Sequence, residues 1–447
     1  MIKNLKNLIS VSNLSNILKK QVVRNILTVG IITLFLKGVG FYKESVVASH
    51  FGLSEILDTF FIASLVPGFI MNVFLGAFQS VFIPNYVAEL KSGNNVASFQ
   101  STGLLITGLV SLLFMVIAYL FTDLYLKVFF SGHDQEYYDL IISQFHFLLP
   151  CIIFWGYSSL LSGLLNINNE FRLSSYSGIF LPICIILSLF FLKDYFGDLV
   201  LAFGTLLGSI IGWFYLVVIC IKKDILHFSL PNFHNKNIKL MFAQTPAKVS
   251  SGFLSGLNSV VDQYFAAQLA IGSIAAINYG RKMPAFLIGL LVVAITNVLL
   301  PYFSKLIHED RDRAFKLVFK MIKITFTGAA VFAIAGIFAT DFLVELFFQR
   351  KEFTSNDTEI VSSIQKVFLA YIPFAISGMI IVNFLTSINK NAFMAYVSFG
   401  ALILNIIFDY IFIKYYGILG IAICTTIVIV IKNTVMFLYT YRQSKLV

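Results

Sequence analysis

Apolar segments of about 20 residues recur along the whole of this 447-residue chain and limit its fold more than any other feature. A helix needs about 20 residues to cross the hydrocarbon core of a bilayer. Inside that core only helices and closed barrels satisfy their own backbone hydrogen bonds. The segments lie at 24–48, 58–84, 101–123, 138–164, 173–193, 198–221, 247–271, 281–304, 316–340, 362–388, 393–413 and 417–440. They predict an all-α polytopic membrane protein with about twelve transmembrane helices.

The distribution of charge predicts the orientation of the chain in the membrane. The formal net charge is +10, and most Lys and Arg residues fall in alternate connections, on the side of the N-terminus. The positive-inside rule therefore places both termini in the cytoplasm. The basic excess reflects this topology, so no nucleic-acid partner is expected. Residues 1–24 are either an interfacial amphipathic helix or a basic tail, and they do not have the pattern of a cleavable signal peptide.

The residues of common enzyme sites are not arranged for catalysis. All four cysteines lie in apolar segments without a CxxC pair, and the six histidines have no metal-ligand spacing. Phosphate-binding, dinucleotide-binding and nucleophile motifs are not found in a usable context. The sequence therefore predicts a protein that is not an enzyme and has no tightly bound cofactor.

Prolines indicate an internal repeat. Pro67 and Pro84 in the second segment are as far apart as Pro284 and Pro301 in the eighth. Because the two copies are six segments apart, they predict two six-helix lobes related by a parallel pseudo-twofold axis. The predicted divisions are an N-terminal lobe at 1–222, a cytoplasmic linker at 223–246 and a C-terminal lobe at 247–447.

Charged residues occur within or beside the apolar segments. A charged side chain at mid-helix costs roughly 2.5–3.5 kcal/mol on insertion scales, so such residues usually face a polar interior. The candidates for a cargo site are Lys37, Lys43, Glu44, Asp58, Arg281 and Lys282. Arg forks two oxygens and Lys acts as a point charge, so a cluster from both lobes suits a diphosphate.

Less specific interpretations of the same residues stay open. Asp58 at the start of the second segment can be an interfacial acid, and Arg281 and Lys282 can extend toward lipid headgroups. Gly38 and Gly40 predict a break in the first helix that turns its lysines toward the cleft.

A second group of polar residues suits a cation. Asn405 and Asp409 lie at i and i+4 on one helical face, while Asp262 and Thr425 lie within other apolar segments. Carboxylate, amide and hydroxyl oxygens are hard ligands for an alkali or alkaline-earth cation. The alternatives are two separate interfacial acids, or an ion pair between one of the acids and Lys432 in the last apolar segment.

Five stretches resemble the MviN/MurJ family of lipid-linked saccharide flippases, which belongs to a superfamily that includes multidrug extruders. They are Gly40-Phe41-Tyr42-Lys43-Glu44, Phe51 to Phe61, Gly76 to Pro84, Gly272 to Arg281, and Leu346 to Thr354. The resemblance implies that Lys37, Lys43 and Arg281 face a central cavity that receives a diphosphate. It also implies a sodium site at Asp262, Asn405, Asp409 and Thr425.

The chain departs from the family pattern at several positions. Met71 and Asn72 stand at the usual arginine pair of the second helix, and Gly280 and Pro284 replace acids near Arg281. The chain also ends after its twelfth segment, where family members usually continue with two more helices. These departures leave lipid II and another polyprenyl-diphosphate saccharide as alternative cargoes.

The sequence is therefore interpreted as a monomeric flippase in the bacterial cytoplasmic membrane. Its expected cargo is a polyprenyl-diphosphate-linked saccharide moved from the inner to the outer leaflet by alternating access, and its other partners are membrane lipids. Sodium is the expected coupling ion. A cation-coupled multidrug extruder is the second interpretation, although such a protein favours acids in its cleft. A membrane-embedded glycan polymerase or ligase is the third.

Overall fold

The computed structural model describes residues 21–92 and 95–446, so most of the predicted interfacial helix or tail at 1–24 lies outside it. The described residues form helices and connecting turns, with no strand among them. The elements are α3 (Gln21–Phe51), α4 (Glu55–Ile70), the π-helical η1 (Met71–Leu75), α5 (Gly76–Ser92), α6 (Val96–Phe129), α7 (Gln135–Leu148), α8 (Cys151–Ile167), α9 (Phe171–Tyr176), η2 (Ser177–Ile179), α10 (Phe180–Phe191), α11 (Lys193–Phe196), η3 (Gly197–Leu199), α12 (Val200–Lys222), α13 (Lys236–Ala266), α14 (Ser273–Glu309), α15 (Arg311–Phe348), α16 (Ser355–Ser387), α17 (Asn391–Tyr416) and α18 (Ile418–Ser444).

Within the described residues, nine helical stretches are long and apolar enough to cross a membrane. They are Glu55–Ser92, Val96–Phe129, Gln135–Ile167, Phe171–Phe191, Lys193–Lys222, Arg311–Phe348, Ser355–Ser387, Asn391–Tyr416 and Ile418–Ser444. The other three predicted segments lie mainly on α3, α13 and α14, helices of 31, 31 and 37 residues. The all-α membrane fold is thus confirmed, while the number of spans stays a prediction.

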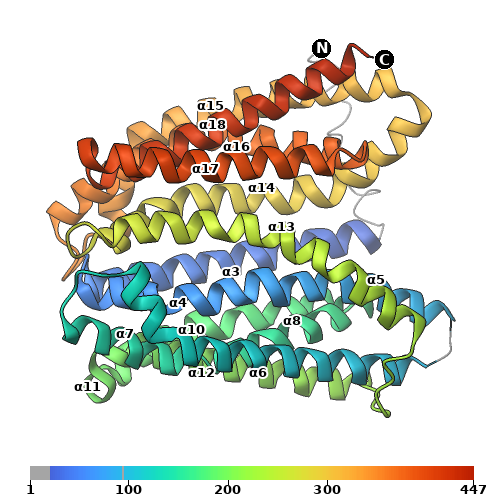
Figure 1. Ribbon diagram of the computed structural model, residues 1–447, viewed down its shortest axis with the longest axis horizontal. Helices are drawn as coiled ribbons and strands as arrows, with labels where there is room; N and C mark the ends of the chain where they lie inside the picture. The colour runs from blue at the N-terminus through green and yellow to red at the C-terminus, as the bar shows by residue number, and fades with distance from the viewer. Residues whose placement is uncertain (1–20, 93–94, 447) are drawn as a thin grey trace.

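The two halves of the chain occupy different sides of the molecule. Figure 1 shows α3 to α12, in blue to green, on one side, and α13 to α18, in yellow to red, on the other. In the first half α10 and α8 pack on α12, and in the second half α14, α15 and α18 pack on α16. Contacts between the halves run from α13 to α5, η1 and α4, and from α3 to α14 and α15. We call this surface of contact the seam. The predicted lobe boundaries and pseudo-twofold symmetry stay predictions.

Two local expectations were wrong. Gly38 and Gly40 do not break the first helix, because α3 is continuous to Phe51. The seventh segment was expected to run to residue 271, but α13 ends at Ala266. A short turn follows, and it closes at Gly272 with a φ of +90°. A Cβ at Gly272 would lie 2.6 Å from the carbonyl oxygen of Leu53, so the turn needs glycine for both conformation and space.

The second predicted segment contains a π-helical turn between two α-helices. Pro67 has no backbone N–H to donate within α4. The π-helical turn η1 follows at Met71–Leu75, before α5 continues the segment. Such turns are rare and occur often at functional sites. Here the turn lies at the seam, packed against α13.

Candidate functional site

Lys43, Glu44 and Lys282 form a charged cluster across the seam, which we call the lysine–glutamate cluster. Glu44 Oε1 lies 2.6 Å from the Lys43 Nζ on α3 and 2.7 Å from the Lys282 Nζ on α14. The three side chains are 17%, 14% and 26% exposed in this order: Lys43, Glu44, Lys282. Two ammonium groups share one carboxylate, so the cluster has a formal charge of +1 and retains capacity for an anion.

Lys37 also reaches the second half, but at a different place. A Cβ built on Gly289 of α14 would lie 2.9 Å from the Lys37 Nζ. Lys37 is six residues before Lys43, which is about 9 Å along the helix axis. The ammonium group of Lys37 is therefore held against a glycine backbone, at a separate point on the same seam.

A second group of polar side chains lies inside the C-terminal half, and we call it the aspartate cluster: Asp262, Arg281, Asn405, Asp409 and Thr425. Arg281 forms an ion pair with Asp262 Oδ2. Asn405 Nδ2 donates to Asp262 Oδ1 at 3.3 Å, and the Thr425 hydroxyl donates to Oδ2 at 3.3 Å. All but Asp409 line a cavity of about 290 Å³.

Two acceptors of the aspartate cluster have unused capacity. Asp409 is fully buried, and neither of its carboxylate oxygens has a hydrogen-bond partner among the described residues. The side-chain oxygen of Asn405 is also buried and has no hydrogen-bond partner among the described residues. Buried polar atoms are normally satisfied, so unpaired ones call for an explanation such as a bound ion. With Asp262, Asp409 and Arg281 ionised, the cluster has a formal charge of −1.

Helix geometry explains why adjacent basic residues join different clusters. Successive residues on an α-helix are about 100° apart around the axis. Lys282 therefore faces α3 across the seam, while Arg281 faces α13, where Asp262 lies. The guanidinium carbon of Arg281 also lies 5.1 Å from the ring centroid of Phe368, a cation–π distance.

Asp58 has a defined structural role at one end of the seam. It is 3% exposed, and its two carboxylate oxygens accept hydrogen bonds from the backbone N–H groups of Gly272 and Ala275, both at 2.7 Å. A carboxylate at a helix N-terminus satisfies free donors and interacts favourably with the helix dipole. Asp58 thus connects α4 to the start of α14, and each of its two carboxylate oxygens accepts a hydrogen bond there.

Polar contacts also join the halves near the end of α5. Glu89 Oε2 accepts from the Asn237 side chain at 2.6 Å, and Asn85 donates to the Gln244 side chain at 3.0 Å. The predicted linker is anchored nearby to the first half, since the Asn232 N–H donates to the Thr102 hydroxyl at 2.9 Å. The seam is therefore bonded at both ends.

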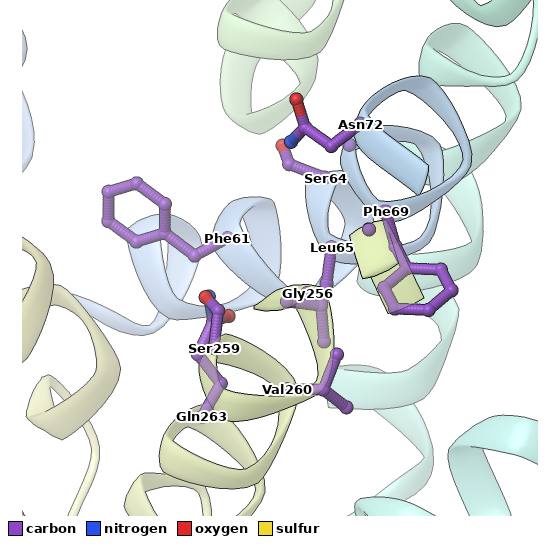
Figure 2. Close-up of a pocket in the computed structure, with 11 residues that line it drawn as sticks. Phe61, Ser64, Leu65, Phe69, Asn72, Gly256, Ser259, Val260 and Gln263 are labelled. Carbon is purple, nitrogen blue, oxygen red and sulfur yellow. The ribbon is translucent and has the colours of Figure 1, made fainter. Parts of the chain in front are cut away.

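A cavity of about 450 Å³ lies between the two ends of the seam. Figure 2 shows it between α4 and α13, with Ser64 and Asn72 on one wall and Ser259 and Gln263 on the other. Ser259 also lines the cavity of the aspartate cluster. We call the 450 Å³ cavity the seam groove.

The expected site residues are thus distributed over several places. Lys43, Glu44 and Lys282 are in contact, and Asp262, Asn405 and Thr425 are joined by hydrogen bonds, with Asp409 one turn from Asn405. Arg281, expected beside Lys37 and Lys43, is bonded to Asp262 instead. No cavity found among the described residues is lined by all three of these basic side chains.

The structure explains one departure from the family pattern and adds residues that the sequence did not indicate. A Cβ at Gly280 would lie 2.4 Å from the side chain of Ile364, so close packing of α14 on α16 favours glycine there. The groove residues Ser64, Ser259 and Gln263 belong to no motif, and their only signal is polarity within an apolar segment.

Comparison with solved structures defines the class. The structure matches a solved "Lipid II flippase MurJ, inward closed conformation" with a TM-score of 0.80 and 26% identity, covering 92% of this chain and 87% of that one. It also matches an inward-facing multidrug resistance MATE family transporter of the MOP superfamily with a TM-score of 0.75 and 13% identity, covering 93% and 98%. The second likeness shows that the fold is shared with transporters.

The family is shown by sequence. A model of the lipid II flippase MurJ family matches residues 47–447, and the chain belongs to that family. One relative, a probable lipid II flippase MurJ from Buchnera aphidicola subsp. Baizongia pistaciae, is 25% identical over 95% of this chain and 83% of its own length. Another, a probable lipid II flippase MurJ from Vibrio cholerae, is 26% identical over 91% and 80%.

Proposed function

We propose that this chain moves a polyprenyl-diphosphate-linked saccharide, lipid II or a related precursor, from the inner to the outer leaflet of the bacterial cytoplasmic membrane. Family membership supports the flippase activity, and relatives named for lipid II support the cargo class. The observation that carries the proposal is the lysine–glutamate cluster. Two lysines from opposite halves share one carboxylate at the seam, which leaves a net positive charge for an anion.

The cluster also suggests how cargo couples to movement. A diphosphate has several oxygens that compete with Glu44 for Lys43 and Lys282. Because the lysines lie on α3 and α14, the bound diphosphate takes over the bridge between the halves. Cargo binding then alters the free-energy difference between arrangements of the halves, as alternating access requires.

Alternate opening requires the two ends of the seam to separate in turn. At one end the Asp58 carboxylate must leave the N-terminus of α14. At the other, the Glu89–Asn237 and Asn85–Gln244 contacts must break. In our proposal the end with Asp58 faces outward and both termini are cytoplasmic, as the distribution of basic residues predicts. The protein acts as a monomer and changes no covalent bond of its cargo.

The aspartate cluster is proposed to bind sodium. The unpaired oxygens of Asp409 and Asn405 fit an oxygen-liganded cation, and the cluster has a net negative charge when both acids and Arg281 are ionised. Within the described part of the chain, no group of three or more His, Cys, Asp or Glu side chains is arranged as metal ligands. The carboxylate, amide and hydroxyl oxygens of the aspartate cluster suit a monovalent cation better than a transition metal. Bound sodium would compensate the acids that Arg281 alone leaves uncompensated.

The direct test is flipping by the purified chain in liposomes. A polyprenyl diphosphate carrying a disaccharide is placed in one leaflet, and its appearance in the other is followed with a membrane-impermeant sugar-binding protein. We expect protein-dependent flipping, reduced at least about a hundredfold in the Lys43→Gln/Lys282→Gln variant because each lost charged contact costs about tenfold or more. Lys366→Gln is the control, since Lys366 pairs with Asp341 within the C-terminal half. Flipping by the double variant at the wild-type rate would refute the proposal.

A further inference from the structure

The seam groove has the properties of a binding site for an uncharged polar ligand. Its volume of about 450 Å³ is within the range of small-molecule sites, which is roughly 300–1,000 Å³. We propose that the seam groove binds the saccharide of the cargo, that it selects sugars without a charge, and that Gln263 is a specificity-determining residue. This inference rests on the proposed function, because it assigns the part of the cargo that follows the diphosphate.

The walls of the groove match the chemistry of a sugar. Ser64 and Asn72 on one wall and Ser259 and Gln263 on the other carry hydroxyl and amide groups, which both donate and accept hydrogen bonds (Figure 2). Sugar hydroxyl and acetamido groups have the same dual capacity. The ring of Phe61 lines the groove as well and offers an apolar surface to the carbon face of a sugar ring.

Gln263 is the strongest indication of a ligand. Its side chain is buried, with 8% exposure, and lines the groove. Its amide oxygen has no hydrogen-bond partner among the described residues. A buried acceptor without a partner is unfavourable, so a ligand hydroxyl or N–H donating to it recovers a bond that the protein itself does not make. In Figure 2 the side chains of Gln263 and Ser259 project to the same side of α13, away from the apolar side chains of Leu65 and Val260.

Local backbone structure leaves room for the groove. Gly252 and Gly256 allow α13 to approach α4 and η1 closely, since a Cβ at Gly256 would lie 2.9 Å from the ring of Phe69. The π-helical turn places Asn72 in the lining at the same level of the seam. Asn72, at one of the two positions where the family has arginines, thus becomes part of an uncharged wall.

The groove lies beside the diphosphate site. The Lys282 Nζ, which is bonded to Glu44, is 5.9 Å from the ring centroid of Phe61 at the groove. Ser259 connects the groove with the cavity of the aspartate cluster. A diphosphate on Lys43 and Lys282 therefore places the attached sugar at the Phe61 end of the groove.

The lining explains the selection against charge. None of the described residues that line the groove has an ionisable side chain. A sugar carboxylate entering it would lose water without gaining a counter-charge, which is strongly unfavourable. A neutral N-acetylated sugar loses only hydrogen bonds that the amides and hydroxyls replace.

The test compares three probes that share one lipid: undecaprenyl diphosphate alone, the same lipid carrying N-acetylglucosamine, and the same lipid carrying glucuronic acid. Affinities for the full chain are measured by native mass spectrometry in detergent. We expect the N-acetylglucosamine probe to bind about tenfold more tightly than the bare lipid, and the glucuronic acid probe no more tightly than the bare lipid. Gln263→Leu should abolish the tenfold advantage and leave affinity for the bare lipid unchanged.

Gln365→Leu is the matched control. Gln365 is also buried with an amide unpaired among the described residues, but it lines a different cavity, which lies between α3, α14, α15 and α16. This variant should keep the tenfold advantage. Three results would overturn the inference while leaving the proposed function intact: no gain from the sugar, equal affinity for the acidic and neutral sugars, or equal weakening of all probes by Gln263→Leu. If no probe binds the wild-type chain, the proposed function fails, and this inference with it.

Discussion

The lysine–glutamate cluster and the aspartate cluster are built from similar charged groups but differ in position and in unused bonding capacity. The first bridges the two halves, and its one carboxylate is shared by two lysines. The second lies within the C-terminal half, and one of its two carboxylates has no partner among the described residues. Their formal charges are +1 and −1.

This difference assigns ligands of opposite charge to the two clusters. A cluster with excess ammonium groups at the seam attracts an anion, and its ion pairs depend on the distance between the halves. A cluster with excess carboxylate inside one half attracts a cation and changes the packing of α13 against α17 and α18. Because Arg281 and Lys282 are adjacent on α14, one helix connects both places. Rotation or bending of α14 would therefore alter both clusters together.

Arg281→Gln should have the largest effect on this comparison. Removing the guanidinium leaves Asp262 and Asp409 as two uncompensated buried acids. Removing one partner of a buried ion pair, here Arg281 from Asp262, costs about 3–5 kcal/mol. The melting temperature in sodium-free buffer should fall strongly and transport should be lost. Sodium should recover more of the melting temperature than in the wild type, since the cluster is then more negative.

The double variant Arg281→Gln/Asp262→Asn gives the control for this prediction. It removes both charges of the ion pair, so it should be more stable than Arg281→Gln alone. If the double variant is less stable than the wild type by the full sum of the losses in Arg281→Gln and Asp262→Asn, the ion pair does not determine the stability of the cluster.

Glu44→Gln disrupts the lysine–glutamate cluster and should reduce the stability of the chain less than Arg281→Gln does. The two lysines then face each other without their shared carboxylate, which should destabilise the chain by about 2 kcal/mol, the scale of a charged hydrogen bond. Affinity for undecaprenyl diphosphate should rise, because a competing anion is removed. Melting curves and lipid titrations measure the two effects. Glu345→Gln on the exposed face of α15 is the control, and an unchanged or weaker lipid affinity in Glu44→Gln would contradict the displacement mechanism.

Thr425→Val has the smallest expected effect. It removes one hydroxyl from the aspartate cluster while keeping the shape of the side chain. The sodium concentration that gives half of the thermal stabilisation should rise about five- to tenfold, the equivalent of about 1 kcal/mol. Thr434→Val on the same helix, which lines a different cavity, is the control. An equal shift in both variants would mean that the hydroxyl of Thr425 is not a ligand.

The fold was predictable because bilayer length and polarity act on every segment. All twelve apolar segments lie mainly or wholly on helices, and the errors are local, as at Ala266, where the helix ends before the apolar run does. The i, i+4 spacing of Asn405 and Asp409 placed them together in the aspartate cluster, because helical periodicity fixes which residues share a face. Such inferences need only one helix.

The pairings between helices were less predictable. Arg281 was expected with Lys37 and Lys43, but its partner is Asp262, because the rotation of α14 about its axis decides which neighbour each residue meets. Asp58 was expected either at the cargo site or at the interface, and its role depends on a turn 214 residues later in the chain. Gln263 gave no signal in the sequence beyond its polarity within an apolar segment, since its importance comes from an unpaired oxygen in a cavity.

The most direct test of the central claim is to separate the two ligands on one preparation. The thermal stabilisation of the chain by sodium and by undecaprenyl diphosphate is measured for the wild type, Lys43→Gln and Asp409→Asn. We predict that Lys43→Gln loses most of the stabilisation by the lipid and keeps the response to sodium, while Asp409→Asn loses the response to sodium and keeps that to the lipid. If each variant loses both responses in equal measure, or if the losses are exchanged, the assignment of an anion to one cluster and a cation to the other is contradicted.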